Sequence, residues 1–311
     1  MKVAVIGLGT MGMGAALNLA ASGHAVEGVE PRRDAWAELE QAGGRCVADA
    51  ALLPEGLEAA VLFVVNAAQA EAVLFGEAGC LARLASDAVV VCGVTMAPEA
   101  SRRLAGLVEA SGRHYLDAPV SGGRPAARAG TMTVMASGSE AAFARAAPVL
   151  AAYAGKVWRL GEAAGVGSTV KMVNQLLAGV HIAVAAEALA LGIRSGADPR
   201  TLFEVISTSA GSSWMWQNRV PHILDGDDTP LSSVNIFVKD LGIVLDQARA
   251  LTFPLPLAAA AHQLFLAAAA SGHGARDDAF VIRVWEALAG IALPAKPAPE
   301  KQVGEPTAAG R

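Results

Sequence analysis

The chain has 311 residues, of which 53% are hydrophobic and 17% are charged, and its formal net charge is −5. At roughly 100–200 residues per domain this length indicates two domains, and the apolar composition indicates a globular chain with a large core. The chain has 24 Lys and Arg but 29 Asp and Glu, so it has no strong positive field to bind nucleic acid or an anionic membrane surface. Cys46, Cys80 and Cys92 lack metal-ligand spacing and predict buried thiols in a reducing, cytoplasmic compartment.

The first half of the chain, residues 1–164, alternates short apolar runs with helical patterns. The runs cover residues 3–6, 25–29, 61–65, 88–92 and 114–118. Nearly continuous apolar runs are typical of parallel strands that helices cover on both faces, so the pattern predicts an α/β domain with a doubly wound sheet. Two later runs, at 132–136 and 157–160, are expected to close the same sheet.

The second half, residues 165–294, changes to helices without strand signals. Gly165 and Gly196 bracket one helix of about 28 residues, expected to join the two domains. Asp198 followed by Pro199 predicts the cap and first position of the next helix. Further helices are expected at 237–251, 256–271 and 278–288, which makes the second domain all-helical. Residues 295–311 lose their hydrophobic character and predict a disordered tail.

The apolar character of the helical half bears on membranes and on assembly. Gln175, His181 and Glu187 interrupt the longest apolar run, so no membrane span is predicted. Residues 176–191 and 256–270 are richer in Ala and Leu than one small domain can bury. We therefore expect a homodimer or homotetramer whose helical domain binds substrate and forms the subunit interface.

The segment Gly7-Leu8-Gly9-Thr10-Met11-Gly12 follows a predicted strand and opens a predicted helix, which is the required context of a dinucleotide fingerprint. Its glycines let backbone N–H groups approach a pyrophosphate at the helix N-terminus, where the helix dipole favours anions. The sheet is therefore expected to be of the Rossmann type.

The nature of the dinucleotide depends on the end of the second strand. Glu30 lies there, 18 positions after Gly12, where a carboxylate accepts hydrogen bonds from ribose hydroxyls and repels a 2′-phosphate. This favours NAD as the cofactor. Arg32 and Arg33 can pair with such a phosphate, so NADP stays open, although both also fit a solvated helix start.

Polar residues follow three further strands at the edge where open α/β sheets bind ligands. Asn66, Thr95 and the turn Ser121-Gly122-Gly123 occupy these positions. Each alone is explained equally well by helix capping or by turn formation. Their convergence on one sheet edge favours a cleft for cofactor and substrate.

Lys171, Asn174 and Gln175 share one face early in the long helix, because they are three and four positions apart. A desolvated lysine has a lowered pKa and can exchange a proton with a substrate hydroxyl. The alternative is a snorkelling lysine beside two hydrogen-bonding amides. Lys239-Asp240 is a weaker candidate, since exposed ion pairs commonly explain such a dipeptide. The six histidines show no metal-ligand spacing, so no metal is expected.

Taken together, four motifs in this order resemble the β-hydroxyacid dehydrogenase family over nearly the whole chain to about residue 294. The motifs are Gly7 to Gly12 with Asn18-Leu19, Asp117 to Gly123 with Gly130-Thr131, Gly167 with Lys171 to Asn174, and Lys239-Asp240-Leu241. Four ordered motifs are far more specific than a glycine loop alone.

The resemblance implies a role for each matching residue. Lys171 is similar to the family's catalytic lysine, and Ser121, Gly122 and Gly123 to its substrate-carboxylate loop. Asn174 would orient the substrate, Thr95 would contact the nicotinamide end, and Lys239 would close over cofactor and substrate. Gln175 stands where the family more often has a second Asn.

The implied reaction is NAD-dependent oxidation of a small anionic hydroxy acid, L-threonate at C2 to 2-dehydro-L-erythronate. This substrate is favoured by the segment from Trp214 to Leu241. The alternatives are 3-hydroxyisobutyrate or tartronate semialdehyde as the substrate and, outside alcohol chemistry, a nucleotide sensor or an imine reductase.

Overall fold

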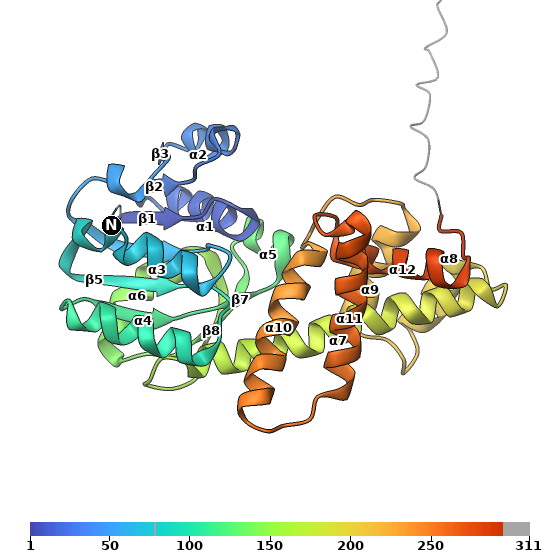
Figure 1. Cartoon of the computed structure of the whole chain (residues 1–311). Coiled ribbons are helices and arrows are strands. Elements are labelled where there is room, and N and C mark those ends of the chain that lie inside the picture. Colours follow the sequence, from blue (N-terminus) through green and yellow to red (C-terminus); the bar gives the residue numbers. More distant parts are fainter. Residues whose placement is uncertain (78, 295–311) are drawn as a thin grey trace, which may run out of the picture.

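A computed structural model describes residues 1–77 and 79–294. One half is built around a parallel sheet and the other half is helical, and a single long helix runs from one into the other (Figure 1). The predicted fold class, a Rossmann-type sheet followed by a long helix and helical C-terminal part, is confirmed. The predicted tail lies outside the described residues.

The large sheet has the strand order β3-β2-β1-β4-β5-β6, and all its pairs are parallel. Its strands are β1 (Lys2–Ile6), β2 (Ala25–Val29), β3 (Arg45–Val47), β4 (Leu57–Leu62), β5 (Leu84–Cys92) and β6 (His114–Asp117). The chain order reverses between β1 and β4, which creates the switch point where such sheets bind ligands. The fourth strand ends at Leu62, three residues before the predicted end, and β3 was not predicted.

Helices cover both faces of this sheet, as the continuous apolar runs require. They are α1 (Thr10–Ala21), α2 (Trp36–Gln41), α3 (Ala67–Phe75), α4 (Pro98–Ala110), α5 (Gly123–Ala129) and α6 (Glu140–Tyr153), with short 3-10 turns at Arg33–Ala35, Ala50–Leu52 and Cys80–Arg83. Val3 and Val5 belong to one apolar core and Ala4 and Ile6 to the other. All three cysteines are buried free thiols, as predicted.

The prediction that residues 132–136 and 157–160 close the large sheet is wrong. They form a second sheet of β7 (Val120–Ser121), β8 (Met132–Ala136) and β9 (Ala154–Arg159), in that order. An isolated bridge between Asp117 and Ser137 and a hydrogen bond from Met135 N to Pro119 O join the region of β6 to this sheet. Ala118 N still donates to Cys92 O of the large sheet, but Pro119 has no backbone N–H to continue that ladder, and the chain pairs with β8 instead.

The helical half begins with α7 (Val166–Arg194), whose 29 residues match the predicted long helix. It ends before Gly196, whose φ is +86°, and Asp198 caps the following helix by accepting a hydrogen bond from Thr201 N at 2.8 Å. The remaining elements are α8 (Pro199–Ser207), α9 (Trp214–Leu224), α10 (Val234–Ala250), α11 (Pro256–Ala268), a π-helical turn (Ala269–His273), a 3-10 turn (Asp278–Ile282) and α12 (Arg283–Ala289). The sequence pattern did not reveal α9.

By length and composition, α7 is the one helix in the described part of the chain that is apolar enough to cross a membrane. The expectation that Gln175, His181 and Glu187 would reduce the run below spanning length is therefore wrong. Core helices of soluble proteins pass the same test, and α7 packs against α8, α9, α10 and α11 while burying Lys171. The helix is thus part of the folded core.

Two polar side chains join elements around the sheet: the buried Asp117 holds α7, and the half-buried Asn18 links α1 to α5. The Asp117 carboxylate at the end of β6 accepts hydrogen bonds from Gly165 N at 2.9 Å, Ser168 N at 2.8 Å and Ser168 Oγ at 2.7 Å. It therefore caps the first turn of α7, one turn before Lys171. Asn18 Nδ2 donates to Gly14 O and Ala127 O, which ties α1 to α5.

Candidate active site

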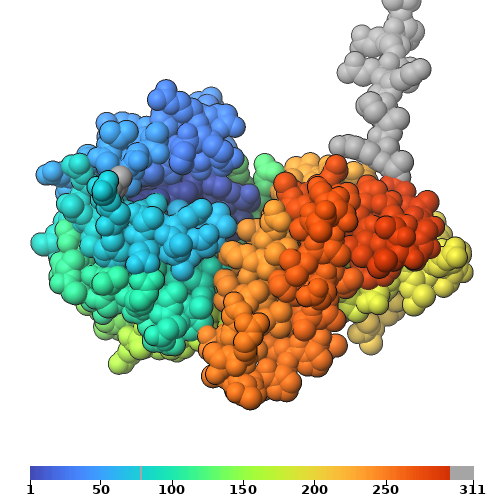
Figure 2. All heavy atoms as spheres, in the orientation of Figure 1, coloured from blue at the N-terminus to red at the C-terminus, as the bar shows by residue number. Residues whose placement is uncertain are grey.

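A cleft of about 820 Å³ lies between the two halves, which meet as adjoining lobes in Figure 2. Of the predicted site residues, it brings together Gly9, Thr10, Met11, Thr95, Ser121, Gly122, Gly123, Lys171, Asn174, Gln175 and Lys239. Of the three strand ends expected to converge, those carrying Thr95 and the Ser121-Gly122-Gly123 turn line the cleft, whereas Asn66 does not, and the long helix supplies the facing side.

The other predicted residues lie next to the cleft without lining it. Gly7 and Gly12 form the turn beneath the glycine loop, and Leu8 is buried in the core beside them. Glu30 is buried directly after β2. Asn66 caps α3, because its Oδ1 accepts a hydrogen bond from Gln69 N at 2.9 Å. The side chain of Asn66 thus acts as the helix cap that its sequence context also allowed.

The glycine loop fits a dinucleotide by leaving room for it. A Cβ on Gly12 would collide with the carbonyl oxygen of Gly7, whose own φ of +91° suits only glycine. A Cβ on Gly9 would meet nothing within 4 Å, so open space lies above it. No side chain caps the N-terminus of α1, which leaves its N–H groups for a phosphate.

Glu30, predicted to contact the ribose of a dinucleotide, is held by hydrogen bonds at the end of β2. Its Oε1 accepts hydrogen bonds from Arg32 Nε at 3.0 Å and Arg32 N at 3.2 Å, and its backbone oxygen accepts one from Trp36 Nε1. The Glu30 side chain is 9% exposed, whereas that of Arg32 is 65% exposed. The carboxylate is thus held in place, while the guanidinium is free to move toward solvent.

The loop between β7 and α5 presents backbone instead of side chains. Gly122 and Gly123 have φ angles of +127° and +65°, which favour glycine at both positions. A Cβ on Gly122 would also press against Ala126. No side chain caps α5. Backbone N–H groups here are suited to a carboxylate oxygen, in agreement with the role that the resemblance implied for this loop.

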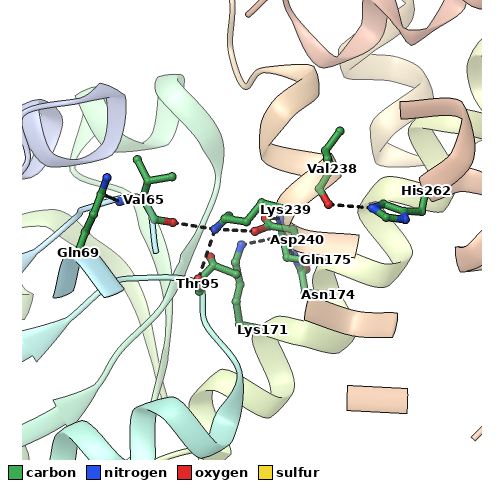
Figure 3. Close-up of polar contacts among 10 residues, drawn as sticks. All are labelled: Val65, Gln69, Thr95, Lys171, Asn174, Gln175, Val238, Lys239, Asp240 and His262. Carbon is green, nitrogen blue, oxygen red and sulfur yellow. Dashed lines mark hydrogen bonds and ion pairs between the residues drawn. The ribbon is translucent and has the colours of Figure 1, made fainter. Parts of the chain in front are cut away.

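The facing side carries a continuous polar network across α7 and α10 (Figure 3). Lys171 Nζ donates to Gln175 Oε1 at 2.7 Å, and Asn174 Nδ2 donates to the same oxygen at 3.0 Å. Gln175 Nε2 in turn donates to Asp240 Oδ2 at 2.5 Å. The glutamine therefore connects the lysine of one helix to a carboxylate of another, and its longer side chain spans that gap.

Lys171 is 7% exposed, and its burial changes its acidity. The pKa of the Lys171 ammonium is lowered to about 8, mainly by burial; Asp240 opposes this shift and Lys239 contributes to it. A substantial fraction of this lysine is therefore neutral near pH 8. A neutral amine facing a cleft is able to accept a proton from a substrate hydroxyl.

Lys239 bridges the two halves across the cleft. Its ammonium lies 2.8 Å from Asp240 Oδ1 and donates to Val65 O at 2.9 Å and Thr95 O at 3.3 Å. These carbonyls follow β4 and β5, so the lysine joins α10 to the edge of the sheet (Figure 3). The closing role that the resemblance implied for Lys239 stays a prediction, and these contacts place its ammonium between the two halves.

Two charged residues of the cleft, Asp240 and Arg219, were not among the predicted site residues. Asp240 is 2% exposed and is the charged partner of the network; in the sequence it was marked only as part of the Lys239-Asp240-Leu241 motif. Arg219 is 6% exposed and falls within the segment 214–241 that the resemblance marked. Nothing local singled it out, because its partner Asp278 is 59 positions away.

Comparisons with known proteins agree with this architecture. Residues 2–161 match the family model for the NAD-binding domain of 6-phosphogluconate dehydrogenase, and residues 165–285 match that for the NAD-binding segment of NADP-dependent 3-hydroxyisobutyrate dehydrogenase.

Similar proteins extend the match over nearly the whole chain. L-threonate dehydrogenase from Cupriavidus necator is 51% identical over 95% of this chain and 98% of its own. That from Escherichia coli K12 is 49% identical over 94% and 96%. The crystal structure of a 3-hydroxyisobutyrate dehydrogenase from Salmonella typhimurium covers 91% of this chain and 99% of its own, with 46% identity and a TM-score of 0.87.

The chain belongs to the 3-hydroxyisobutyrate dehydrogenase family. It is an NAD(P)-dependent dehydrogenase, as the resemblance implied. In the described part of the chain, no group of three His, Cys, Asp or Glu residues is arranged to hold a metal ion.

Proposed function

We propose that this chain oxidises L-threonate at C2 to 2-dehydro-L-erythronate, with NAD as cofactor and Lys171 as general base. The observation that carries the proposal is the buried Lys171 amine, which lies in the cleft between the glycine loop and the Ser121–Gly123 loop with its pKa lowered to about 8. Similarity to L-threonate dehydrogenases at 47–51% identity supports the substrate.

In the proposed reaction, each group of the chain has a separate task. Bound NAD would supply a hydride acceptor for the hydrogen on C2. The neutral amine of Lys171 takes the proton of the C2 hydroxyl, so the C–H and O–H bonds break as the C=O bond forms. Backbone N–H groups of Ser121 to Gly123 hold the substrate carboxylate, and Asn174 orients the reacting carbon. Gln175 holds the lysine by its hydrogen bond.

The cofactor would be held by the loop from Gly7 to Gly12, with Glu30 on the ribose hydroxyls, a choice that favours NAD over NADP. Thr95 would border the nicotinamide end, and Asn66 would support the neighbouring loop as the cap of α3. Lys239 closes the cleft through its bonds to Val65 O and Thr95 O. On this proposal residues 1–164 bind the cofactor, and residues 165–294 complete the substrate site and support assembly.

The experiment is an initial-rate panel with L-threonate, D-threonate, D-erythronate, 3-hydroxyisobutyrate and glycerate, each with NAD and with NADP, and with tartronate semialdehyde and a cyclic imine, each with NADH and with NADPH. We expect the highest kcat/KM for L-threonate with NAD. A higher kcat/KM for 3-hydroxyisobutyrate, or for reduction of tartronate semialdehyde, would assign the chain the activity of another member of the family. Tight NADH binding without turnover of any hydroxy acid would favour a sensor, and turnover of a cyclic imine would favour an imine reductase.

The same proposal includes a homodimer or homotetramer in the cytoplasm, acting in sugar-acid catabolism. An apolar stripe on α7 supports the assembly: Val170, Val173, Leu177, Val184 and Leu191 are 37–68% exposed and recur at spacings of three, four and seven residues. Light scattering after size-exclusion chromatography should give a dimer or tetramer. The charged variant Val184→Lys should shift it toward monomer, and a monomeric wild-type protein would contradict the assembly.

A further inference from the structure

One charged side chain of the cleft has no task in the proposed reaction. Among the described residues that line the cleft, the charged ones are Lys171, Arg219, Lys239 and Asp240. In the proposed reaction Lys171 is the base and Lys239 closes the cleft. Asp240 pairs with Lys239 and is connected to Lys171 through Gln175. Arg219, on α9, remains.

The charge of Arg219 is already neutralised. Its Nε donates to Asp278 Oδ1 at 2.5 Å and its Nη2 donates to Asp278 Oδ2 at 3.1 Å, a bidentate pair. Burial raises the pKa of the Asp278 carboxyl to about 6, while Arg219 lowers it, so the carboxylate is ionised at pH 8. A neutralised guanidinium is a poor anchor for a second carboxylate, but its N–H groups still donate to neutral oxygens.

Arg219 has N–H groups that make no hydrogen bond within the described part of the chain. Besides the two bonds to Asp278, its Nη1 donates to Asn218 Oδ1. A guanidinium has five N–H groups, so one on Nη1 and one on Nη2 remain. Arg219 lines the cleft, so these two N–H groups are the candidates for a hydrogen bond to a ligand there.

The wall around Arg219 is held rigidly by two buried aspartates. Asp277 Oδ2 accepts a hydrogen bond from Leu231 N at 2.7 Å, and Asp278 N donates to Ser232 O at 2.8 Å. The segment with Leu231 and Ser232 also lines the cleft. The guanidinium and this segment therefore share one support, which fixes where the remaining N–H groups lie.

The proposed position of the substrate would bring its carbons beyond C2 against this wall. If the carboxylate binds at Ser121 to Gly123 and C2 lies at Lys171, both as proposed above, the carbons beyond C2 must face the remaining lining. That lining includes Trp214 and Met215 of α9, which supply apolar area, and Arg219, which supplies donors. A polyhydroxylated chain suits this combination better than a methyl-branched one does.

We propose that Arg219 is a specificity-determining residue that donates hydrogen bonds to the terminal hydroxyl of a polyhydroxylated acid. The inference rests on the proposed function, since it names the part of the substrate that this wall recognises. A site built to donate to a hydroxyl rejects the analogue that lacks it, because the donors are then left unpaired.

The test compares L-threonate with its 4-deoxy analogue in wild type, Arg219→Met and Arg219→Lys. We expect Arg219→Met to lower kcat/KM for L-threonate about 100-fold and for the 4-deoxy analogue less than about threefold. Arg219→Lys should fall between, because an ammonium lacks the fork geometry. Arg200→Met, which removes an exposed ion pair outside the cleft, is the matched control and should change neither value.

A second variant distinguishes loss of the hydrogen bond to substrate from misfolding of the Arg219 variant. Arg219→Met alone leaves Asp278 buried and unpaired, so the double variant Arg219→Met/Asp278→Asn removes both charges together. It should show the same loss of discrimination. Equal losses for both substrates would overturn the inference and leave the proposed function standing. A wild-type protein without turnover of L-threonate would overturn both.

Discussion

The two walls of the cleft are built by opposite means. The glycine loop, residues 7–12, forms one wall, and its decisive feature is that glycine has no side chain. A Cβ at position 12 would collide with backbone, and the space above Gly9 is open. On the wall formed by α7 and α10, the decisive feature is buried side chains, because Lys171, Gln175 and Asp240 form one hydrogen-bonded chain.

Because of this difference, substitutions in the two walls should have different effects on binding and on rate. A backbone surface binds by shape and by N–H groups, so substitutions there act through collision or through occupied space. A network of titratable side chains acts through protonation, so substitutions there change rates and their pH dependence. The following experiments test this contrast, beginning with the largest expected effect.

Replacing Lys171 by Met should give the largest loss. We expect kcat to fall by about 10²–10⁴, because the proton acceptor is removed, while NADH binding persists on the other wall. Fluorescence titration with NADH and initial rates measure the two effects. Lys156→Met, at an exposed position on β9, is the matched control. Retention of more than a tenth of wild-type turnover by the Lys171 variant would exclude the general-base role.

The same variant tests linkage between protonation and stability. The pKa of Lys171 is about 8 when folded and near 10.5 when unfolded, so the unfolded chain binds more protons between these values. Wild-type stability should therefore rise with pH from 8 to 10.5. At pH 7 the Tm of Lys171→Met should not lie below that of wild type, and its advantage should shrink across this window.

Gly12→Ala and Gly9→Ala form a pair that tests the glycine wall. The first should destabilise the fold by about 1–3 kcal/mol or more, because its Cβ meets the Gly7 carbonyl. The second should leave Tm unchanged and weaken only NAD binding, since its Cβ enters the space meant for the cofactor. Thermal unfolding and NADH titration separate the two. Unchanged affinity in Gly9→Ala would mean that the dinucleotide does not approach this loop.

Asp240→Asn should shift a pH profile more than it lowers a rate. Oxidation needs the neutral amine, so kcat/KM should rise with pH through about 8 in wild type. Because Asp240 raises the pKa of Lys171, its loss should move this limb to lower pH. A charged hydrogen bond contributes about 1.5–3 kcal/mol, so a loss of about tenfold at the plateau is expected. Asp246→Asn, exposed on the same helix, should leave the limb in place.

Glu30→Gln should give the smallest effect, on cofactor preference alone. Removing the carboxylate ends the repulsion of a 2′-phosphate and frees Arg32 from its ion pair. We expect the NAD to NADP ratio of kcat/KM to fall about two- to tenfold, with Tm little changed. Rates with both cofactors at one ionic strength measure this. An unaltered ratio would show that another group selects the cofactor.

The sequence predicted best those features whose signals are local. The glycine loop, the limits of α7 and the Asp198 cap each depend on neighbouring residues, and the structure has all of them. The hydrogen bond from Gln175 to Asp240 spans 65 positions and the pair of Arg219 with Asp278 spans 59, so no window of sequence contains either. The separate sheet of β7, β8 and β9 was missed for the same reason, since strand pairing is decided by the tertiary fold.

The unbroken α7 is held at one end by Asp117. That carboxylate fixes Gly165 and Ser168, at the first turn, to the end of β6. Lys171 lies five residues along the helix, about 7.5 Å from its start, whereas Arg194 lies about 42 Å away at 1.5 Å per residue. Any rotation about this held end would displace Arg194 several times as far as Lys171. The residue proposed as the base therefore lies in the part of the helix that such a rotation would move least.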